Sequence, residues 1–135
     1  TEVLGDHALV SMAKSAALLA RDNEALDAVA GALFDQTAER HATGLALPVA
    51  ALRAQPLAIL TRVIRMACLA ADVRPRDLTM EHIDLLARLI TDRSVTGPVA
   101  LPGRVSATRV HDRLVVTSAA LLAQPLSPAG HESED

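Results

Sequence analysis

The chain has 135 residues, half of them hydrophobic, and its one aromatic side chain is Phe34. A chain of this length and composition buries roughly two-thirds of its unfolded surface, which excludes intrinsic disorder for most of it. No apolar run approaches the ~20 residues that span a bilayer, and residues 1–4 lack a signal-peptide pattern. The single cysteine, Cys68, excludes an internal disulfide framework and is typical of a reducing compartment. We therefore expect a cytoplasmic, mainly helical protein with no membrane contact.

Charge is segregated along the sequence, although the net charge is only −3. The first 39 residues contain two basic and seven acidic groups, whereas residues 40–113 contain eleven basic and six acidic groups. From Arg40 to Ala71 there are four arginines and no carboxylate. This clustering predicts a surface for a polyanion in the middle of the chain. The preference for arginine over lysine is also typical of a GC-rich genome. Only the clustering of the arginines, and not their number, is therefore evidence for a polyanion-binding surface.

A helical pattern dominates the first part of the chain. Apolar residues recur at intervals of three and four over residues 9–33, with one polar interruption at Asn23. This period predicts one long helix from about residue 6 to residue 39, or two helices jointed near Asn23. A continuous helix would reach roughly 50 Å, so we expect it to bridge two parts of a larger structure or to form a homodimer. Polar residues off the stripe, Asp27 among them, are expected to face solvent.

Two prolines mark the next elements. Residues 45–47 predict an edge strand, because the following Pro48 limits pairing. Pro48 also suits the start of a short helix through Arg53, and Pro56 the start of another helix. The predicted buried stripe of that second helix is Leu57, Leu60, Ile64, Ala67 and Ala71, and its predicted outer side is Thr61, Arg62, Arg65 and Asp72. Residues 73–77 are expected to form a loop.

A further helix begins after that loop, with Thr79 as its predicted N-cap. Its predicted inward face is Ile83, Leu86, Ala87 and Ile90. Asp84 and Arg88 have the spacing of an ion pair on its outer face. The pattern then changes to short strands over residues 99–101, 105–110 and 114–117, the last two joined by a tight turn at His111 and Asp112.

The sequence thus predicts a mainly α fold with a long N-terminal helix, a small helical domain and a short C-terminal β-hairpin or small antiparallel sheet. We expect three parts along the chain. Residues 1–43 would be a long interdomain helix, and residues 44–117 a helical domain that ends in the hairpin. Residues 118–135 would be a partly disordered tail, because residues 125–135 are polar and acidic.

Catalytic signatures are nearly absent. The sequence contains no glycine-rich phosphate loop and no Gly-x-Ser-x-Gly, Cys-x-x-Cys or His-Glu-x-x-His motif. The five histidines are scattered, with no histidine partner three or four residues away. Cys68 has apolar neighbours and is expected to be a buried, inert thiol. We therefore predict no catalytic residue, no cofactor-binding residue and no metal ligand in this chain.

The arginines remain as candidate ligands for phosphate. A guanidinium fork can engage two phosphate oxygens where no carboxylate competes, and Arg62 and Arg65 share one helical face. Without interleaved aromatic residues, base stacking on single strands is disfavoured, and a duplex RNA backbone is the better target. A solvated helix face is the alternative interpretation. The candidate RNA-binding residues are Arg53, Arg62, Arg65, Arg74, Arg76, Arg104, Arg109 and Arg113.

Several short motifs follow the long helix in a fixed order. They are residues 52–57, Arg62-Val63-Ile64-Arg65, residues 77–83, residues 97–103, and a strand over 105–109 with Leu114-Val115-Val116 after the turn. This series resembles the region after the catalytic domain in bacterial, especially actinobacterial, tRNA(Ile)-lysidine synthetases. The resemblance covers about residues 1–117.

The family joins lysine to the wobble cytidine of a tRNA(Ile) with a CAU anticodon, after ATP has adenylated the base. The resemblance implies that catalysis, ATP and Mg²⁺ belong to an N-terminal domain whose Ser-Gly-Gly-x-Asp-Ser loop this sequence lacks. It implies that this chain is a fragment that binds and positions tRNA(Ile), with Arg62 and Arg65 as suspected contacts, and that it does not bind DNA. The alternative is a stand-alone helical interaction or dimerisation module without RNA binding.

We predict that this chain alone forms no lysidine, because it contains no nucleotide-binding loop. The measurements are ATP–pyrophosphate exchange and incorporation of labelled lysine into tRNA(Ile) by the purified chain, and both should stay at background. Lysine incorporation above background would contradict the interpretation of the chain as a fragment.

Overall fold

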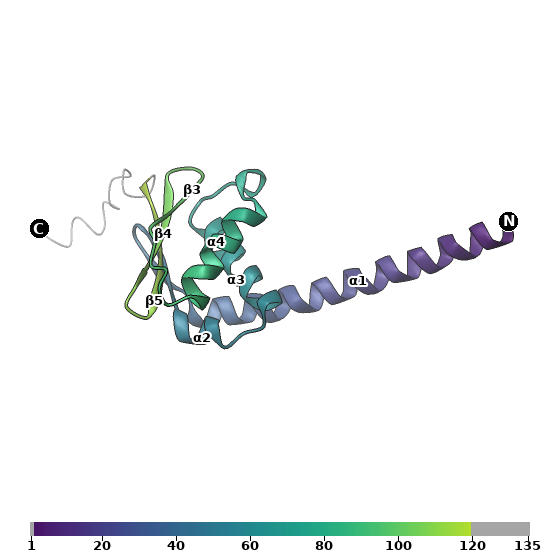
Figure 1. Ribbon diagram of the computed structural model, residues 1–135, viewed down its shortest axis with the longest axis horizontal. Helices are drawn as coiled ribbons and strands as arrows, with labels where there is room; N and C mark the ends of the chain where they lie inside the picture. The colour runs from purple at the N-terminus through teal and green to yellow at the C-terminus, as the bar shows by residue number, and fades with distance from the viewer. Residues whose placement is uncertain (1, 120–135) are drawn as a thin grey trace, which may run out of the picture.

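The computed structural model describes the backbone of residues 2–119 and the side chains of residues 10–119. Along this part of the chain, one long helix is followed by two strands, then by a group of helices, and then by three more strands (Figure 1). In order, the elements are α1 (Glu2–Thr37), β1 (Glu39–His41), β2 (Gly44–Pro48), α2 (Val49–Arg53), α3 (Leu57–Ala70), the short 3₁₀ helix η1 (Pro75–Asp77), α4 (Met80–Thr91), β3 (Val99–Leu101), β4 (Val105–Val110) and β5 (Arg113–Ser118). The segment predicted as a plain loop, residues 73–77, therefore contains η1.

The long helix α1 is continuous, without a joint at Asn23, and its N-terminal half extends away from the rest of the molecule (Figure 1). Near its C-terminal end α1 packs against α3 and buries Ala30 and Phe34 in the core. Met12 and Leu19, which lie earlier on the same apolar stripe, are exposed. The stripe therefore has an anchored C-terminal part and an uncovered N-terminal part.

The strands form one antiparallel sheet in the order β1-β2-β5-β4-β3. The prediction of an edge strand at residues 45–47 is wrong, because β2 lies between β1 and β5. The edge strand on this side of the sheet is β1, formed by residues just after α1, which ends at Thr37 and not at residue 39. Pro48 is the last residue of β2, where the chain turns into α2, so its missing N–H leaves the interior of the ladder intact.

Helices α3 and α4 cover one face of the sheet (Figure 1). The core between them contains the predicted inward residues of both helices, such as Ile64 and Ile90, packed with sheet residues such as Leu47 and Val116. Leu57 is an exception: it was predicted to be buried and is 66% exposed. Leu57 is the first residue of α3 and lies within a run of exposed residues, 56–58. The buried part of the helix begins at Ile59.

The predicted fold class is confirmed, with a five-stranded sheet in place of a single hairpin. The division at residue 43 stays a prediction, although the last turns of α1 share the core of the following domain. Most of the predicted tail, from residue 120 onward, lies outside the described residues. None of the described helices is long and apolar enough to cross a membrane.

Thr79 caps α4 as predicted. Its hydroxyl accepts a hydrogen bond from the His82 N–H at 3.4 Å, and its own N–H donates to His82 Nδ1 at 3.0 Å. The histidine side chain thus completes a reciprocal capping box in a position where glutamate or glutamine is more usual.

We predict that Thr79→Ala lowers the free energy of unfolding by about 1 kcal/mol, because orphan N–H groups at the start of α4 lose their acceptor. Chemical denaturation with helical circular dichroism measures this change. Thr61→Ala is the control, since the Thr61 hydroxyl only donates to carbonyls within α3. The control should stay within about 0.5 kcal/mol of wild type. Equal losses in the two variants would contradict the capping role.

Candidate functional site

The eight arginines predicted to bind RNA fall into two sets. In the first set, each guanidinium makes hydrogen bonds or ion pairs within the chain; its members are Arg53, Arg62, Arg109 and Arg113. In the second set, no such partner exists within the part of the chain that the structure describes; its members are Arg65, Arg74, Arg76 and Arg104. This division separates arginines with a structural role from arginines that are open to a ligand.

Arg53 and Arg109 hold the C-terminal end of α4. Arg53 Nε donates to the Ile90 carbonyl at 3.1 Å, and Arg109 Nη1 reaches the Leu89 carbonyl at 3.5 Å. The last carbonyls of a helix lack intrahelical partners and attract positive charge, so both guanidinium groups suit this position. Arg53 Nη2 is buried without a hydrogen-bond partner in the described chain, so this nitrogen does not face an open surface.

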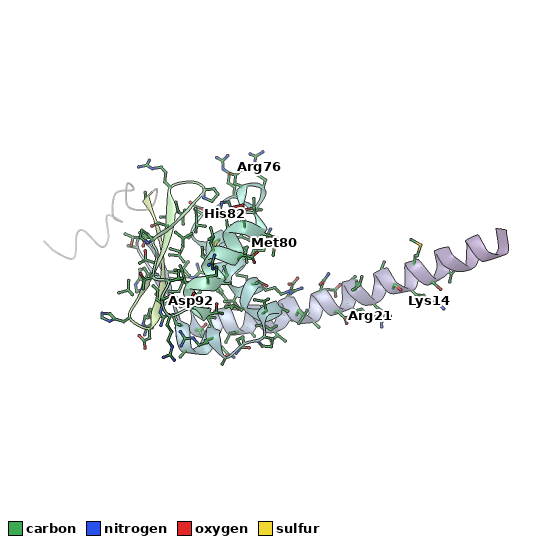
Figure 2. The ribbon with its side chains drawn as sticks, viewed as in Figure 1. Lys14, Arg21, Arg76, Met80, His82 and Asp92 are labelled. Atoms are coloured by element: carbon green, nitrogen blue, oxygen red, sulfur yellow. The ribbon has the colours of Figure 1, made fainter. Side chains whose placement is uncertain are left out.

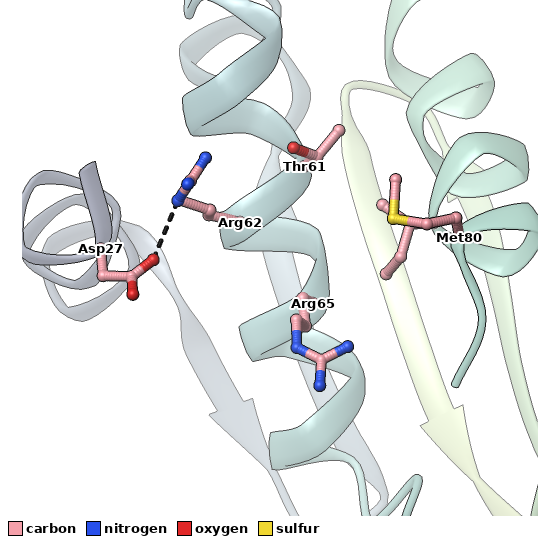
Figure 3. Close-up of a pocket in the computed structure, with 6 residues that line it drawn as sticks. Asp27, Thr61, Arg62, Arg65 and Met80 are labelled. Carbon is pink, nitrogen blue, oxygen red and sulfur yellow. Dashed lines mark hydrogen bonds and ion pairs between the residues drawn. The ribbon is translucent and has the colours of Figure 1, made fainter. Parts of the chain in front are cut away.

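Arg62 is held by α1. Its Nε donates to Asp27 Oδ1 at 2.9 Å (Figure 3). Its Nη2 donates to Asn23 Oδ1 at 3.0 Å, and its Nη1 to the Ala58 carbonyl at 2.9 Å. The expectation that no carboxylate neutralises Arg62 is therefore wrong, because Asp27 reaches it from another helix. Asn23 likewise binds within its own chain, since its Oδ1 accepts the hydrogen bond from Arg62.

Glu39 and Arg113 form a second ion pair at 2.6 Å, between β1 and β5. The predicted pair of Asp84 with Arg88 is not among the ion pairs of the described residues. Arg88 instead acts weakly on Asp92, whose carboxyl pKa is lowered mainly by hydrogen bonds from Ser94 and to a lesser extent by Arg88.

Three open arginines gather at one end of the molecule. Arg74 and Arg76 flank Pro75 at η1, and Arg104 lies in the turn between β3 and β4. This turn is close to the end of α3, since a Cβ on Gly103 would lie 4.0 Å from the Asp72 carbonyl oxygen. We call Arg74, Arg76 and Arg104 the arginine end. Figure 2 shows Arg76 at this end and Asp92 toward the other end of α4.

The arginine end has a modest net charge. Two carboxylates, Asp72 and Asp77, share it with the three arginines, so its formal net charge is +1. All five side chains are exposed on short connections that the core holds in place. Such a surface can bind an extended polyanion through several separate contacts.

The fourth open arginine, Arg65, lies beside a hollow of about 350 Å³ between α1, α3 and the start of α4 (Figure 3). The hollow is lined by Asp27, Thr61, Arg62, Arg65, Met80 and Ile83. A second hollow of about 260 Å³ adjoins it and shares Asp27, Arg62 and Arg65. Sequence reasoning did not place Asp27 and Met80 here, because α1 lies far from α3 and α4 along the chain.

Cys68 is fully buried, and burial raises the pKa of its thiol to about 12, while the nearby Arg65 lowers it slightly. The thiol therefore stays protonated at neutral pH, and the prediction of a buried cysteine is confirmed. Among the described residues, no three His, Cys, Asp or Glu side chains gather in a way that could hold a metal ion.

We predict that a double-mutant cycle of Asp27→Ala and Arg62→Ala gives a coupling free energy of about 0.2–1 kcal/mol, because the pair is partly exposed. Chemical denaturation of the two single variants and the double variant measures it. A matched cycle of Glu24→Ala with Arg62→Ala should give a coupling near zero, since Glu24 makes no ion pair with Arg62. Equal coupling in both cycles would contradict a specific contact.

The family model of the TilS substrate binding domain matches residues 47–115, from β2 to β5. A tRNA(Ile)-lysidine synthase of Thermobifida fusca is 39% identical over 118 residues, which cover 87% of this chain and 35% of the relative. The synthase of Streptomyces coelicolor is 36% identical over 115 residues, covering 85% of this chain and 32% of the relative. The synthase of Salinispora arenicola is 34% identical over 113 residues, which cover 84% of this chain and 33% of the relative.

The chain thus spans about a third of the length of the curated relatives that it matches. The residues that the family model matches include strands β3 and β4, the two core helices and the connections that form the arginine end, whereas β1 and most of β2 precede the match. On this match, the chain belongs to the TilS substrate-binding domain family, in the region that it shares with actinobacterial tRNA(Ile)-lysidine synthases.

Proposed function

We propose that this chain binds and positions tRNA(Ile) for an enzyme that joins lysine to the wobble cytidine of the CAU anticodon. The observation that supports this most directly is the match of residues 47–115 to a substrate-binding domain, in relatives named for that reaction. The substrate that such a domain would bind is a polyanion. The same residues contain all three members of the arginine end.

The proposed contact is with the RNA backbone. Arg74, Arg76 and Arg104 offer guanidinium forks without partners in the described chain, and such forks bind phosphate oxygens in pairs. Their positions on connections at the edge of a packed core fix the spacing between them. Backbone contacts of this kind orient a nucleic acid without reading its sequence.

Catalysis would then belong to a separate part of the enzyme. ATP and Mg²⁺ would act in an ATP-binding domain, and this chain would present the tRNA to it. In this role the protein works in the cytoplasm, where its tRNA substrate is.

A second function is favoured by the uncovered part of α1. Val10, Met12, Leu18 and Leu19 are each more than half exposed, which is unusual for so many large apolar side chains on one segment. This segment suits a contact with another protein surface, including a second copy of the chain. A helical interaction module without RNA binding therefore stays the alternative, and failure of the wild-type chain to bind tRNA would favour it.

We predict that Arg74→Ala with Arg76→Ala weakens binding of a tRNA(Ile) transcript and reduces the slope of log K against log salt. Each lost phosphate contact should reduce the slope by roughly 0.7–0.9 units. Fluorescence anisotropy across a salt titration measures both quantities.

The matched control is Arg88→Ala with Arg93→Ala, which removes two exposed arginines near the other end of α4. This control should leave the slope close to the wild-type value. If both double variants lower the slope equally, binding depends on net charge alone and the arginine end is not the contact.

A further inference from the structure

The hollow beside Arg65 differs in chemistry from the arginine end. Arg65 lies on α3 and Met80 on α4, and both side chains line the hollow (Figure 3). Ile83 lines the hollow from the core side, and the Thr61 hydroxyl donates to carbonyls within α3. A ligand in this space would therefore contact one open guanidinium and several apolar groups.

Charges at the rim make phosphate a poor ligand here. The ion pair of Arg62 with Asp27 neutralises the Arg62 charge, and three of its N–H donors already have acceptors. The Asp27 side chain is 64% exposed, and only Oδ1 is engaged by Arg62. A phosphate group would meet this carboxylate and would lose water against the apolar side chains of Met80 and Ile83.

A flat, neutral heterocycle matches the same groups. Guanidinium planes stack on unpaired bases, and a thioether sulfur makes favourable contacts with an aromatic ring. Arg65 and Met80 present these two groups to the same hollow.

We propose that this hollow binds an unpaired nucleobase of the RNA, in contact with Arg65 and Met80. The inference rests on the proposed function and deepens it, because the arginine end would hold the backbone while the hollow takes a base. The absence of aromatic side chains does not prevent stacking here, since guanidinium and thioether groups take their place.

The first test compares two methionines. Met80→Ala should weaken binding of a tRNA(Ile) transcript by the full chain roughly two- to tenfold, the range of a sulfur–aromatic contact, without changing the salt slope. Met12→Ala is the matched control, because Met12 and Met80 are both 66% exposed and Met12 lies on the uncovered part of α1. Circular dichroism checks that both variants fold.

The second test separates the guanidinium plane from its charge. Arg65→Lys keeps the charge and should still weaken tRNA binding about fivefold or more, with an unchanged salt slope, because the stacking plane is lost. A fully paired RNA duplex serves as the second ligand. Met80→Ala and Arg65→Lys should each bind this duplex as the wild-type chain does.

The results distinguish this inference from the proposed function. Wild-type affinity of Met80→Ala for tRNA, or an equal loss of affinity for tRNA and for the duplex, would overturn the base-binding hollow alone. Failure of the wild-type chain to bind tRNA at all would overturn the proposed function, and the hollow with it.

Discussion

Close packing of α1 on α3 is the constraint on which the surface features of this domain depend. Ala30 is fully buried at the crossing, and the neighbouring Gly31 also presents no bulk to α3. Small side chains let two helices approach closely, and the buried Phe34 adds roughly 1.5–3 kcal/mol from its apolar area. With α1 held in this position, Asp27 reaches Arg62 and the hollow forms beside it.

The same packing changes the meaning of the charge pattern along the chain. The acidic first segment and the basic middle segment are separate in sequence, yet two carboxylates of the former pair with arginines of the latter. Asp27 meets Arg62, and Glu39 meets Arg113. Folding therefore cancels part of the basic excess within the chain. What remains for a partner is set by the arginines that these contacts leave open.

The sequence predicted local structure well and long-range structure poorly. Helical period and proline position predicted α3, and Thr79 marked the start of α4, because these signals act within a few residues. Strand β1 has only three residues, all exposed, so it has no apolar pattern of its own. Its place in the sheet depends on pairing with β2, and the burial of β2 depends on β5, some 70 residues later. No local pattern contains this information.

The arginines show why residue type alone cannot identify a nucleic-acid surface. A guanidinium group satisfies the carbonyls that end a helix as readily as it satisfies a phosphate, because both present partly or fully negative oxygens. Arg53 and Arg109 bind helix carbonyls, whereas Arg74 and Arg76 have no partner in the described chain. The distinguishing property is the set of acceptors that the fold brings to each guanidinium. For Arg53 that acceptor lies 37 residues away along the chain, and for Arg62 the carboxylate lies 35 residues away. A carboxylate-free stretch of sequence therefore shows only that acceptors are absent nearby in the chain, and an arginine becomes a candidate for RNA binding once the fold has left it without one in space.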